Sequence, residues 1–225
     1  MSTLRTRLTL LAALLPNSEV KHACLRRLGW QIAPSAWIGP CIVMRVDAVV
    51  LADRSRIGPL NVLRDLRRIE FGEGARLGRW NWVSAARGLR VGRSDLEATF
   101  TLHREACVTS RHYVDASGGV VVGELATVAG ARSTLLTHGI DLAVNTQSTA
   151  PIHVGRYALV SGNTKLVPGA RVPDYSLIGM GSVVATDLTE PYWLYTGVPA
   201  RKKKPLDPDS AYFHRTRGPV PPPTA

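Results

Sequence analysis

Several features that assign a chain to a familiar class are scarce in these 225 residues. Cysteine occurs only at Cys24, Cys41 and Cys107, with uneven spacing and no CxxC motif. This scarcity excludes a disulfide-stabilised secreted scaffold and predicts reduced thiols in a cytoplasmic compartment. Aromatic residues make up 6% of the chain and do not alternate with basic residues, as a stacking platform for nucleic acid requires. Because no nucleic-acid-binding motif is present either, we expect no nucleic acid partner.

A long apolar run is also missing. The stretch Leu8–Leu15 is almost wholly apolar and follows Arg5 and Arg7, but a membrane-spanning helix needs about 20 such residues. No small-x-small cleavage site follows the stretch, which argues against a signal peptide. A helix that packs against the rest of the chain, or that leans on a membrane surface through its arginines, fits this segment better.

Acidic residues are outnumbered by basic ones, 17 to 28, and the formal net charge is +11. Such an excess indicates an anionic partner, which could be a membrane surface or a phosphate-bearing cofactor. The hydrophobic fraction of 45% and the charged fraction of 20% are ordinary for a globular protein. The chain is long enough for a domain with its own core.

The most regular pattern is a period of six in the last third of the chain. An aliphatic residue stands at every sixth position, namely Val154, Val160, Leu166, Val172, Ile178 and Val184. Helices repeat near 3.6 and half-buried strands at 2.0, so neither explains this spacing. Hexapeptide repeats are typical of a parallel β-helix, in which each unit is a short strand and a corner.

The same period extends back to residue 38, but extra residues shift it at several places. We expect inward-facing residues at Ile38, Met44, Val50, Ile57, Leu63, Phe71, Leu77, Val83, Leu89, Leu96, Leu102, Val108, Val114, Val120, Val122, Val128, Thr134 and Ile140. Each slip must be absorbed at a corner, for which Pro59, Gly72, Gly74 and Gly88 are candidates.

Residues 1–33 lack the period and are predicted to form a helical cap. A second helix should begin after Asn17 or Ser18, present Val20, Cys24, Leu25 and Leu28 as an apolar stripe, and end at Gly29. A cap is expected because an open β-helix end would expose its apolar interior. We therefore predict three parts: the cap at 1–33, the β-helix at 34–188, and an extension at 189–225. The extension should hold one turn near 211–213 and a disordered, proline-rich end.

The run VGRYALVSGNTKLVPGARVPDYSLIGMGSVVATDLTEPYWLYTGVPARKKK resembles the carboxy-terminal half of the hexapeptide-repeat acyltransferases. It is similar to the galactoside, maltose and colanic-acid types of O-acetyltransferase in three features. These are the ladder, meaning the aliphatic residues at every sixth position, the IGMGSVV motif and the closing GVPAR. The resemblance implies an all-β, left-handed parallel β-helix that forms a homotrimer. It also implies transfer of an acetyl or other short acyl group from coenzyme A to a hydroxyl or amine of a small polar acceptor, with a sugar as first choice.

The ladder breaks between Ile140 and Val154, where the polar stretch Asp141–Thr149 predicts a projecting loop. His138 stands just before this loop and matches the catalytic histidine of the family. An acceptor hydroxyl needs a base to take its proton, and imidazole has a suitable pKa. A structural role for His138 at a corner remains the alternative. His112 is a candidate second participant, and Asp141 is a candidate to orient either His138 or an acceptor.

The resemblance also implies a coenzyme A site that needs no metal. The pantetheine arm is expected against backbone at Ser161, Gly162, Gly179 and Met180, with an oxyanion donor near Ser161–Gly162. The phosphates are expected near Arg201 and Lys202, and Lys203 and Lys204 extend this run. A run of charges that simply faces solvent is the alternative for the lysines.

Two rival functions are weighed against this one. A zinc-dependent carbonic anhydrase on the same fold would need two histidines five residues apart, and the histidines at 103, 112, 138 and 153 offer no such pair. A non-catalytic hexapeptide-repeat protein that binds an anionic ligand or a membrane surface is the other alternative. Cleavage of a thioester would separate the enzyme from the binding protein.

Overall fold

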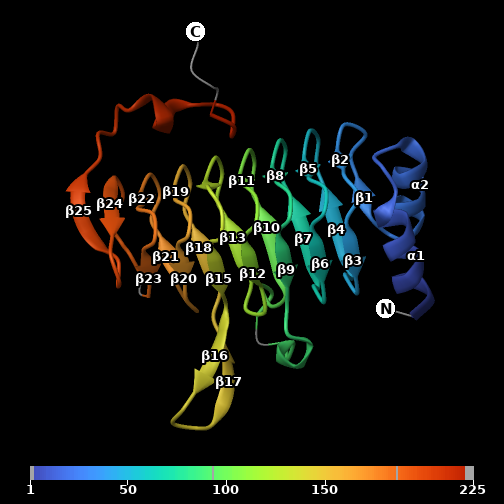
Figure 1. Cartoon of the computed structure of the whole chain (residues 1–225), viewed down its shortest axis with the longest axis horizontal. Helices are drawn as coiled ribbons and strands as arrows, with labels where there is room; N and C mark the ends of the chain where they lie inside the picture. The colour runs from blue at the N-terminus through green and yellow to red at the C-terminus, as the bar shows by residue number, and fades with distance from the viewer. Residues whose placement is uncertain (1–2, 93, 186, 221–225) are drawn as a thin grey trace.

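The computed structural model describes residues 3–92, 94–185 and 187–220 and shows a rod of stacked coils (Figure 1). Each coil contributes one short strand to each of three sheets, and strands of successive coils pair in parallel, as Val108 does with Val128 and Val128 with Val160. The parallel β-helix predicted from the period of six is confirmed, as is the left-handed coil that the family resemblance implies.

The three sheets run the length of the rod. The first pairs, in order, β1 (Gln31–Ile32), β4 (Ala48–Leu51), β7 (Arg68–Phe71), β10 (Thr99–Leu102), β13 (Val120–Val122), β18 (Ile152–Val154) and β21 (Arg171–Val172). The second pairs β2 (Trp37–Ile38), β5 (Arg56–Ile57), β8 (Arg76–Leu77), β11 (Cys107–Val108), β14 (Thr127–Val128), β19 (Leu159–Val160), β22 (Leu177–Ile178), β24 (Trp193–Thr196) and β25 (Arg201–Pro205). The third pairs β3 (Ile42–Met44), β6 (Val62–Arg64), β9 (Trp82–Ser84), β12 (Tyr113–Asp115), β15 (Thr134–Leu136), β20 (Lys165–Leu166) and β23 (Val183–Val184).

The core is the interior of this coil. Every member of the ladder from Val154 to Val184 is buried, as the period predicts. Each buried aliphatic side chain contributes about 1.5–3 kcal/mol relative to an exposed one. The stack continues through aromatic residues, where Phe71 and Phe100 meet edge to face with ring centroids 5.9 Å apart.

The predicted inward positions are wrong in several earlier places. Strands of the first sheet reach four residues and carry two buried residues, as in Val49 and Leu51, so Val50 lies only half-buried between them. In the same way Val43 is buried instead of Met44, and Leu135 instead of Thr134. Three further predicted positions, Leu89, Leu96 and Ile140, lie outside the coil interior, on segments that leave the coil.

Two helices cover the N-terminal end of the rod. Helix α1 (Thr3–Leu14) packs against β3, and α2 (Glu19–Arg27) begins at Ser18, whose hydroxyl accepts the Lys21 N–H at 3.2 Å. The predicted cap at Ser18 is confirmed. The predicted stripe is wrong at Val20, which is exposed, because α2 turns Lys21, His22 and Leu25 toward the protein instead.

The C-terminal extension adds to the coil. Strand β24 continues the second sheet beyond β22, and β25 returns antiparallel beside it. The 3₁₀ turn η2 (Ala211–His214) falls where a single turn is expected, and its Phe213 packs edge-on against the stacked rings of Tyr175 and Tyr192. Residues 221–225 of the predicted disordered end lie outside the described residues, and the three-part division into domains stays a prediction.

Two segments leave the coil at the same corner, between the third sheet and the first. The segment between β9 and β10 contains the turn η1 (Arg87–Leu89), and the segment between β15 and β18 forms a hairpin of β16 (His138–Asp141) and β17 (Thr146–Thr149). Figure 1 shows both projecting from the same side of the rod, with the hairpin reaching far from it. The projecting loop predicted at 141–149 is confirmed, although it begins earlier, at His138.

Candidate active site

His138 and Asp115 form a pair at the corner where the hairpin begins. Asp115 ends β12, and His138 opens the hairpin one coil later, so the stacking of coils brings them together. His138 Nδ1 is hydrogen-bonded to Asp115 Oδ2. The Asp115 side chain is 6% exposed and the His138 side chain 37%, so the imidazole stands between a buried carboxylate and solvent.

The carboxylate is itself held from two sides. Its Oδ1 accepts the Ser117 N–H at 2.7 Å and the Thr137 hydroxyl at 3.2 Å. Thr137 is fully buried and accepts the Gly118 N–H at 2.8 Å, which ties the corner of one coil to the next. Asp115 therefore has little freedom to rotate, and it fixes the orientation of the ring that it binds.

This arrangement determines what the histidine can do. An ionised carboxylate only accepts hydrogen bonds, so the hydrogen on the imidazole lies on Nδ1 and the lone pair lies on Nε2. Nε2 faces away from Asp115 and can take a proton from a bound hydroxyl or amine. A histidine oriented by a buried carboxylate is the geometry of general base catalysis.

A cleft lies between the two projecting segments. Its walls are formed by η1 and Val91 on one side and by β17, the second strand of the hairpin, on the other. The cleft has a volume of about 330 Å³. The lining residues are Gly88, Leu89, Val91, Thr146, Gln147 and Thr149. His138 pairs with Thr149 in the hairpin, so the cleft begins beside the histidine. A small polar molecule would fit there.

Asp141 does not orient His138. It lies near the tip of the hairpin, where its carboxylate accepts the Ala143 N–H at 2.9 Å. The residue that does the orienting, Asp115, was missed from the sequence because it lies 23 positions earlier. Asp115 pairs in register with Leu136, which lies two residues before His138. Comparing each polar residue at the end of a third-sheet strand with the residues one coil later would therefore identify Asp115.

His112 is a structural residue. Its side chain is buried, and both ring nitrogens are used: Nδ1 accepts the Ser133 N–H at 3.2 Å, and Nε2 lies 2.9 Å from the Thr109 hydroxyl. Burial lowers the pKa of His112 to about 4, which keeps the ring neutral. With no nitrogen available, it cannot serve as the second participant in proton transfer.

The structure gathers the predicted coenzyme residues at another corner, between the second sheet and the third. Ser161 and Gly162 follow β19, and Gly179 and Met180 occupy the equivalent positions one coil later, after β22. Thr196 packs beside Gly179 and pairs with Arg201, which brings this arginine to the end of the column. Lys202 differs, because it pairs with Glu190 and lies over the Trp193 ring at 4.8 Å.

Backbone hydrogen bonds reduce the candidates for the expected oxyanion donor. The Ser161 N–H donates to the Ile178 carbonyl at 3.0 Å and is therefore occupied. Within the described part of the chain, the Gly162 N–H has no backbone acceptor. The corner that holds Gly162 and the corner that holds His138 lie at opposite ends of the third-sheet strands.

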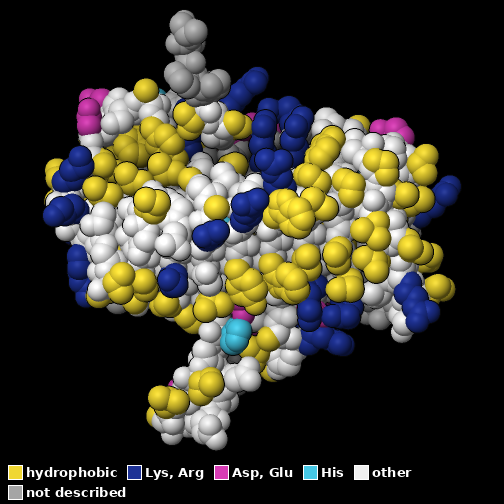
Figure 2. Space-filling model, in the orientation of Figure 1, with side chains coloured by type: hydrophobic (Ala, Val, Ile, Leu, Met, Phe, Trp, Pro, Cys, Tyr) yellow, Lys and Arg dark blue, Asp and Glu magenta, His cyan; other side chains and the backbone are white. Residues whose placement is uncertain are grey.

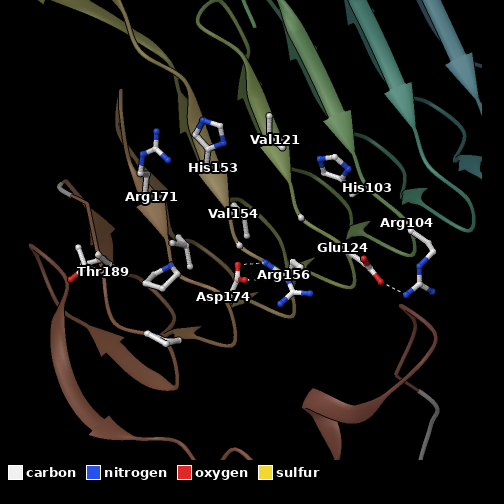
Figure 3. Close-up of a pocket in the computed structure, with 16 residues that line it drawn as sticks. His103, Arg104, Val121, Glu124, His153, Val154, Arg156, Arg171, Asp174 and Thr189 are labelled. Atoms are coloured by element: carbon white, nitrogen blue, oxygen red, sulfur yellow. Dashed lines mark hydrogen bonds and ion pairs between the residues drawn. The ribbon is translucent and has the colours of Figure 1, made fainter.

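A separate groove of about 700 Å³ lies on the outer face of the first sheet (Figure 3). His153 and Arg171 point into it from the sheet, and Arg104 and Arg156 line its edge. All three arginines are paired with carboxylates, Arg104 with Glu124, Arg156 with Asp174 and Arg171 with Asp187. In this groove, whose lining residues are all described, no histidine is hydrogen-bonded to a carboxylate, so His138 stays the candidate base.

Two properties of the described residues bear on cofactors and membranes. They contain no group of three His, Cys, Asp or Glu side chains that could hold a metal ion. No helix in residues 3–92, 94–185 or 187–220 is long and apolar enough to cross a bilayer.

Comparison with known proteins supports the resemblance. No protein-family model matches the chain. Over 133 residues the chain is 27% identical to a serine acetyltransferase of Mycobacterium tuberculosis (strain ATCC 25618 / H37Rv), and the match spans 57% of each protein. The chain thus spans little more than half the length of this curated relative.

Two solved structures of AntD, an N-acyltransferase from Bacillus cereus, share the fold. A point mutant of AntD in complex with dTDP and coenzyme A matches with a TM-score of 0.56 and 12% identity, over 88% of this chain and 95% of AntD. A complex with dTDP and 3-hydroxybutyryl-CoA matches with a TM-score of 0.55 and 12% identity, over 86% and 92% of the two chains.

Proposed function

We propose that this chain, which belongs to the hexapeptide-repeat acyltransferases by its fold and repeat pattern, transfers an acetyl or other short acyl group from coenzyme A to a small polar acceptor. The acceptor group is a hydroxyl or an amine, with O-acetylation of a sugar as first choice. The observation that carries the proposal is the hydrogen bond between His138 and Asp115 at the base of the hairpin.

In the proposed reaction, His138 Nε2 takes the proton from the acceptor hydroxyl or amine as that atom attacks the thioester carbonyl carbon. The carbonyl oxygen gains negative charge, and the Gly162 N–H is the proposed donor to it. The carbon–sulfur bond then breaks, and the imidazolium returns its proton to the departing sulfur. Asp115 stays ionised throughout and stabilises the charged ring.

The proposed donor site is the column formed by Ser161, Gly162, Gly179 and Met180, with Arg201 at its end for a phosphate group. Arg201 is exposed, and its side chain donates to the Ala200 carbonyl, which leaves further guanidinium N–H groups that can reach an anion. Lys202 contributes less in this proposal, because Glu190 already neutralises its charge. The AntD complexes, which contain coenzyme A or 3-hydroxybutyryl-CoA, support a coenzyme A thioester as donor.

A homotrimer is part of the proposal. His138 and the proposed donor column lie at different corners of one chain, so one bound thioester meets both only if a neighbouring copy supplies one of them. The hairpin supports this arrangement, since its apolar residues Ile140, Leu142 and Val144 are exposed and extend away from the rod (Figure 1). Exposed apolar patches of this kind mark contacts with a partner.

The free thiols of Cys24, Cys41 and Cys107 support the expectation of a cytoplasmic protein. The dTDP in the AntD complexes supports nucleotide-linked sugars and amino sugars as acceptors to be tried first. A panel assay tests the proposal: the protein is mixed with several acyl-CoAs and acceptors, release of free thiol is followed, and each product is weighed by mass spectrometry. Thiol release that depends on the acceptor supports transfer. Its absence across the panel favours the alternative of a non-catalytic binding protein.

A further inference from the structure

Helix α1 packs with its small residues and exposes its large ones. Thr9, Ala12 and Ala13 are buried against the rest of the chain. The leucine face, defined as Leu4, Leu8, Leu11, Leu14 and Leu15, is exposed, with Leu4 at 67% and Leu11 at 63%. Leu4, Leu8 and Leu11 follow each other at four and three positions, which places them along one side of the helix. A surface helix normally buries such a stripe, so this face is available for a partner.

The leucine face continues onto the coil. Leu14 lines a groove of about 400 Å³ together with Ile42, Leu60, Trp80 and Trp82, all of which are exposed. The groove lies on the side of the rod, at the corner between the second and third sheets, since Leu60 follows β5 and Trp80 follows β8. Leucines on one side of a helix flanked by arginines are the composition of a helix that lies in the headgroup region of a membrane.

The charge around this surface is one-sided. Residues 3–28 contain five basic residues and one acidic residue, Glu19. Arg7 on α1 and Arg27 on α2 are exposed, and Arg79 is exposed beside Trp80. Figure 2 shows hydrophobic and basic side chains next to each other at the end of the molecule that the helices form. Anionic lipid attracts basic residues that lie near its surface.

The position of the face favours a membrane over a protein partner. Both helices lie at the end of the rod, where no further coil of the described residues covers them (Figure 1). Copies that pack side by side around a symmetry axis cover the sides of the rods and leave this end open. In the proposed trimer, on which this step rests, three leucine faces would lie at the same end, and their joint binding would exceed that of one face.

We propose that the leucine face, with the exposed arginines of the two helices, docks the protein on an anionic phospholipid membrane. The helices lie in the plane of the interface and do not cross it. The rod then stands away from the membrane, with the hairpin and His138 on its side. Acceptors presented at a membrane surface would be held within reach of the enzyme.

The test is sedimentation of the full chain with vesicles of phosphatidylcholine alone or mixed with phosphatidylglycerol. We expect binding to the mixed vesicles that weakens as salt is raised. The double variant Leu8→Gln/Leu11→Gln should bind at least roughly tenfold more weakly, since each leucine loses its transfer into the interface. Val220→Gln, a matched change of an exposed aliphatic residue on the C-terminal extension, should bind like the wild type.

The outcomes are separable from those of the proposed function. Vesicle binding needs no substrate, and transfer to a soluble acceptor should be unchanged in the double leucine variant. No binding to the mixed vesicles would overturn the inference, as would equal binding by the double variant. A change in oligomeric state of the double variant in light scattering would also overturn it, because the leucine face would then be a contact between copies.

Discussion

Asp115 is the residue on which the chemistry of His138 depends. Its carboxylate receives the Nδ1–H of the ring while two further donors, the Ser117 N–H and the Thr137 hydroxyl, hold it in place. Without this carboxylate the imidazole could turn, or could carry its hydrogen on Nε2, and in neither state would it accept a proton from the acceptor. We therefore propose that Asp115 is a positioning residue, and we expect its loss to lower turnover.

Asp115→Asn tests this role. The amide keeps an oxygen for the Ser117 N–H, so the fold should persist, but it does not stabilise the charged ring. We expect kcat to fall by about 10²–10⁴-fold with little change in KM for the acyl-CoA. Asp141→Asn is the control and should keep its turnover. A loss of kcat in Asp141→Asn alone would assign the orienting role to the hairpin instead.

His112 makes stability depend on pH. Burial lowers the pKa of His112 to about 4 from an ordinary value of 6.5. Between these two pH values the ring is protonated in the unfolded chain and neutral in the folded chain. The stability contributed by neutral His112 is therefore complete above pH 6.5 and is lost as pH falls toward 4. The full effect is about 3 kcal/mol.

His112→Gln should remove this dependence. Glutamine can accept the Ser133 N–H and donate to Thr109 as the histidine does, yet it does not titrate. Urea unfolding at about pH 7 and about pH 5 should show a smaller loss of stability for the variant than for the wild type. Equal losses in the two proteins would mean that another group is responsible.

At the scale of elements, the joint between the helical cap and the coil depends on one buried lysine. Lys21 Nζ donates to the carbonyl oxygens of Ala13, Leu15, Ile38 and Gly39, at 2.8–3.0 Å. Two of these carbonyls belong to the end of α1 and its exit, and two to the first coil. Burial lowers the pKa of Lys21 to about 8, while the four carbonyls around the ammonium favour its charged form.

Lys21→Met should loosen this joint. The methionine fills similar space but donates to none of the four carbonyls. Ala13 and Gly39 keep the N–H and the thiol of Cys41 as donors, whereas the carbonyls of Leu15 and Ile38 lose their Lys21 bond, so we expect a loss of about 3 kcal/mol in the free energy of unfolding. Arg27→Met, an exposed change on the same helix, should shift stability by less than about 0.5 kcal/mol. Thermal and urea unfolding measure both, and a Lys21→Met protein as stable as Arg27→Met would show that the cap needs no such link.

The elements differ in how readily the sequence predicts them. The ladder from Val154 to Val184 is uninterrupted, so its period alone located each buried residue. The buried residues of the first sheet are harder to predict, because its longer strands bury two residues each. A period of six can then be matched by the residue between them, as it is at Val50. Aliphatic residues of projecting segments, such as Leu89 and Ile140, also matched the spacing by chance. Periodicity cannot distinguish these residues from buried ones, because it does not indicate where the chain leaves the coil.

The candidate site shows the same limit. His138 was found because it stands before a visible break in the ladder and matches a family motif. Asp115 stands in an unbroken stretch, and only the stacking of coils brings it to His138. The inverted packing of α1 was also beyond prediction, because the choice between its alanine side and its leucine side is made by the shape of the first coil.

At the scale of the whole molecule, the proposed site is divided between two corners of the rod. We expect light scattering to give the mass of a trimer, since one copy cannot bring His138 and the donor column to the same thioester. A monomer at micromolar concentration would contradict this. Mixing offers a stricter test: trimers assembled from His138→Ala and Met180→Trp chains should regain activity that neither variant has alone. Failure to regain it would mean that each chain builds its own site.

The proposed function requires His138 to be the base in acyl transfer from coenzyme A. Wild type and His138→Ala are compared with an acyl-CoA and an acceptor that the panel assay has identified, by following thiol release and the mass of the product. We expect kcat to fall by about 10²–10⁴-fold while KM for the acyl-CoA and the melting temperature change little. Near-full turnover by His138→Ala, or a loss of activity that only follows unfolding, would contradict it.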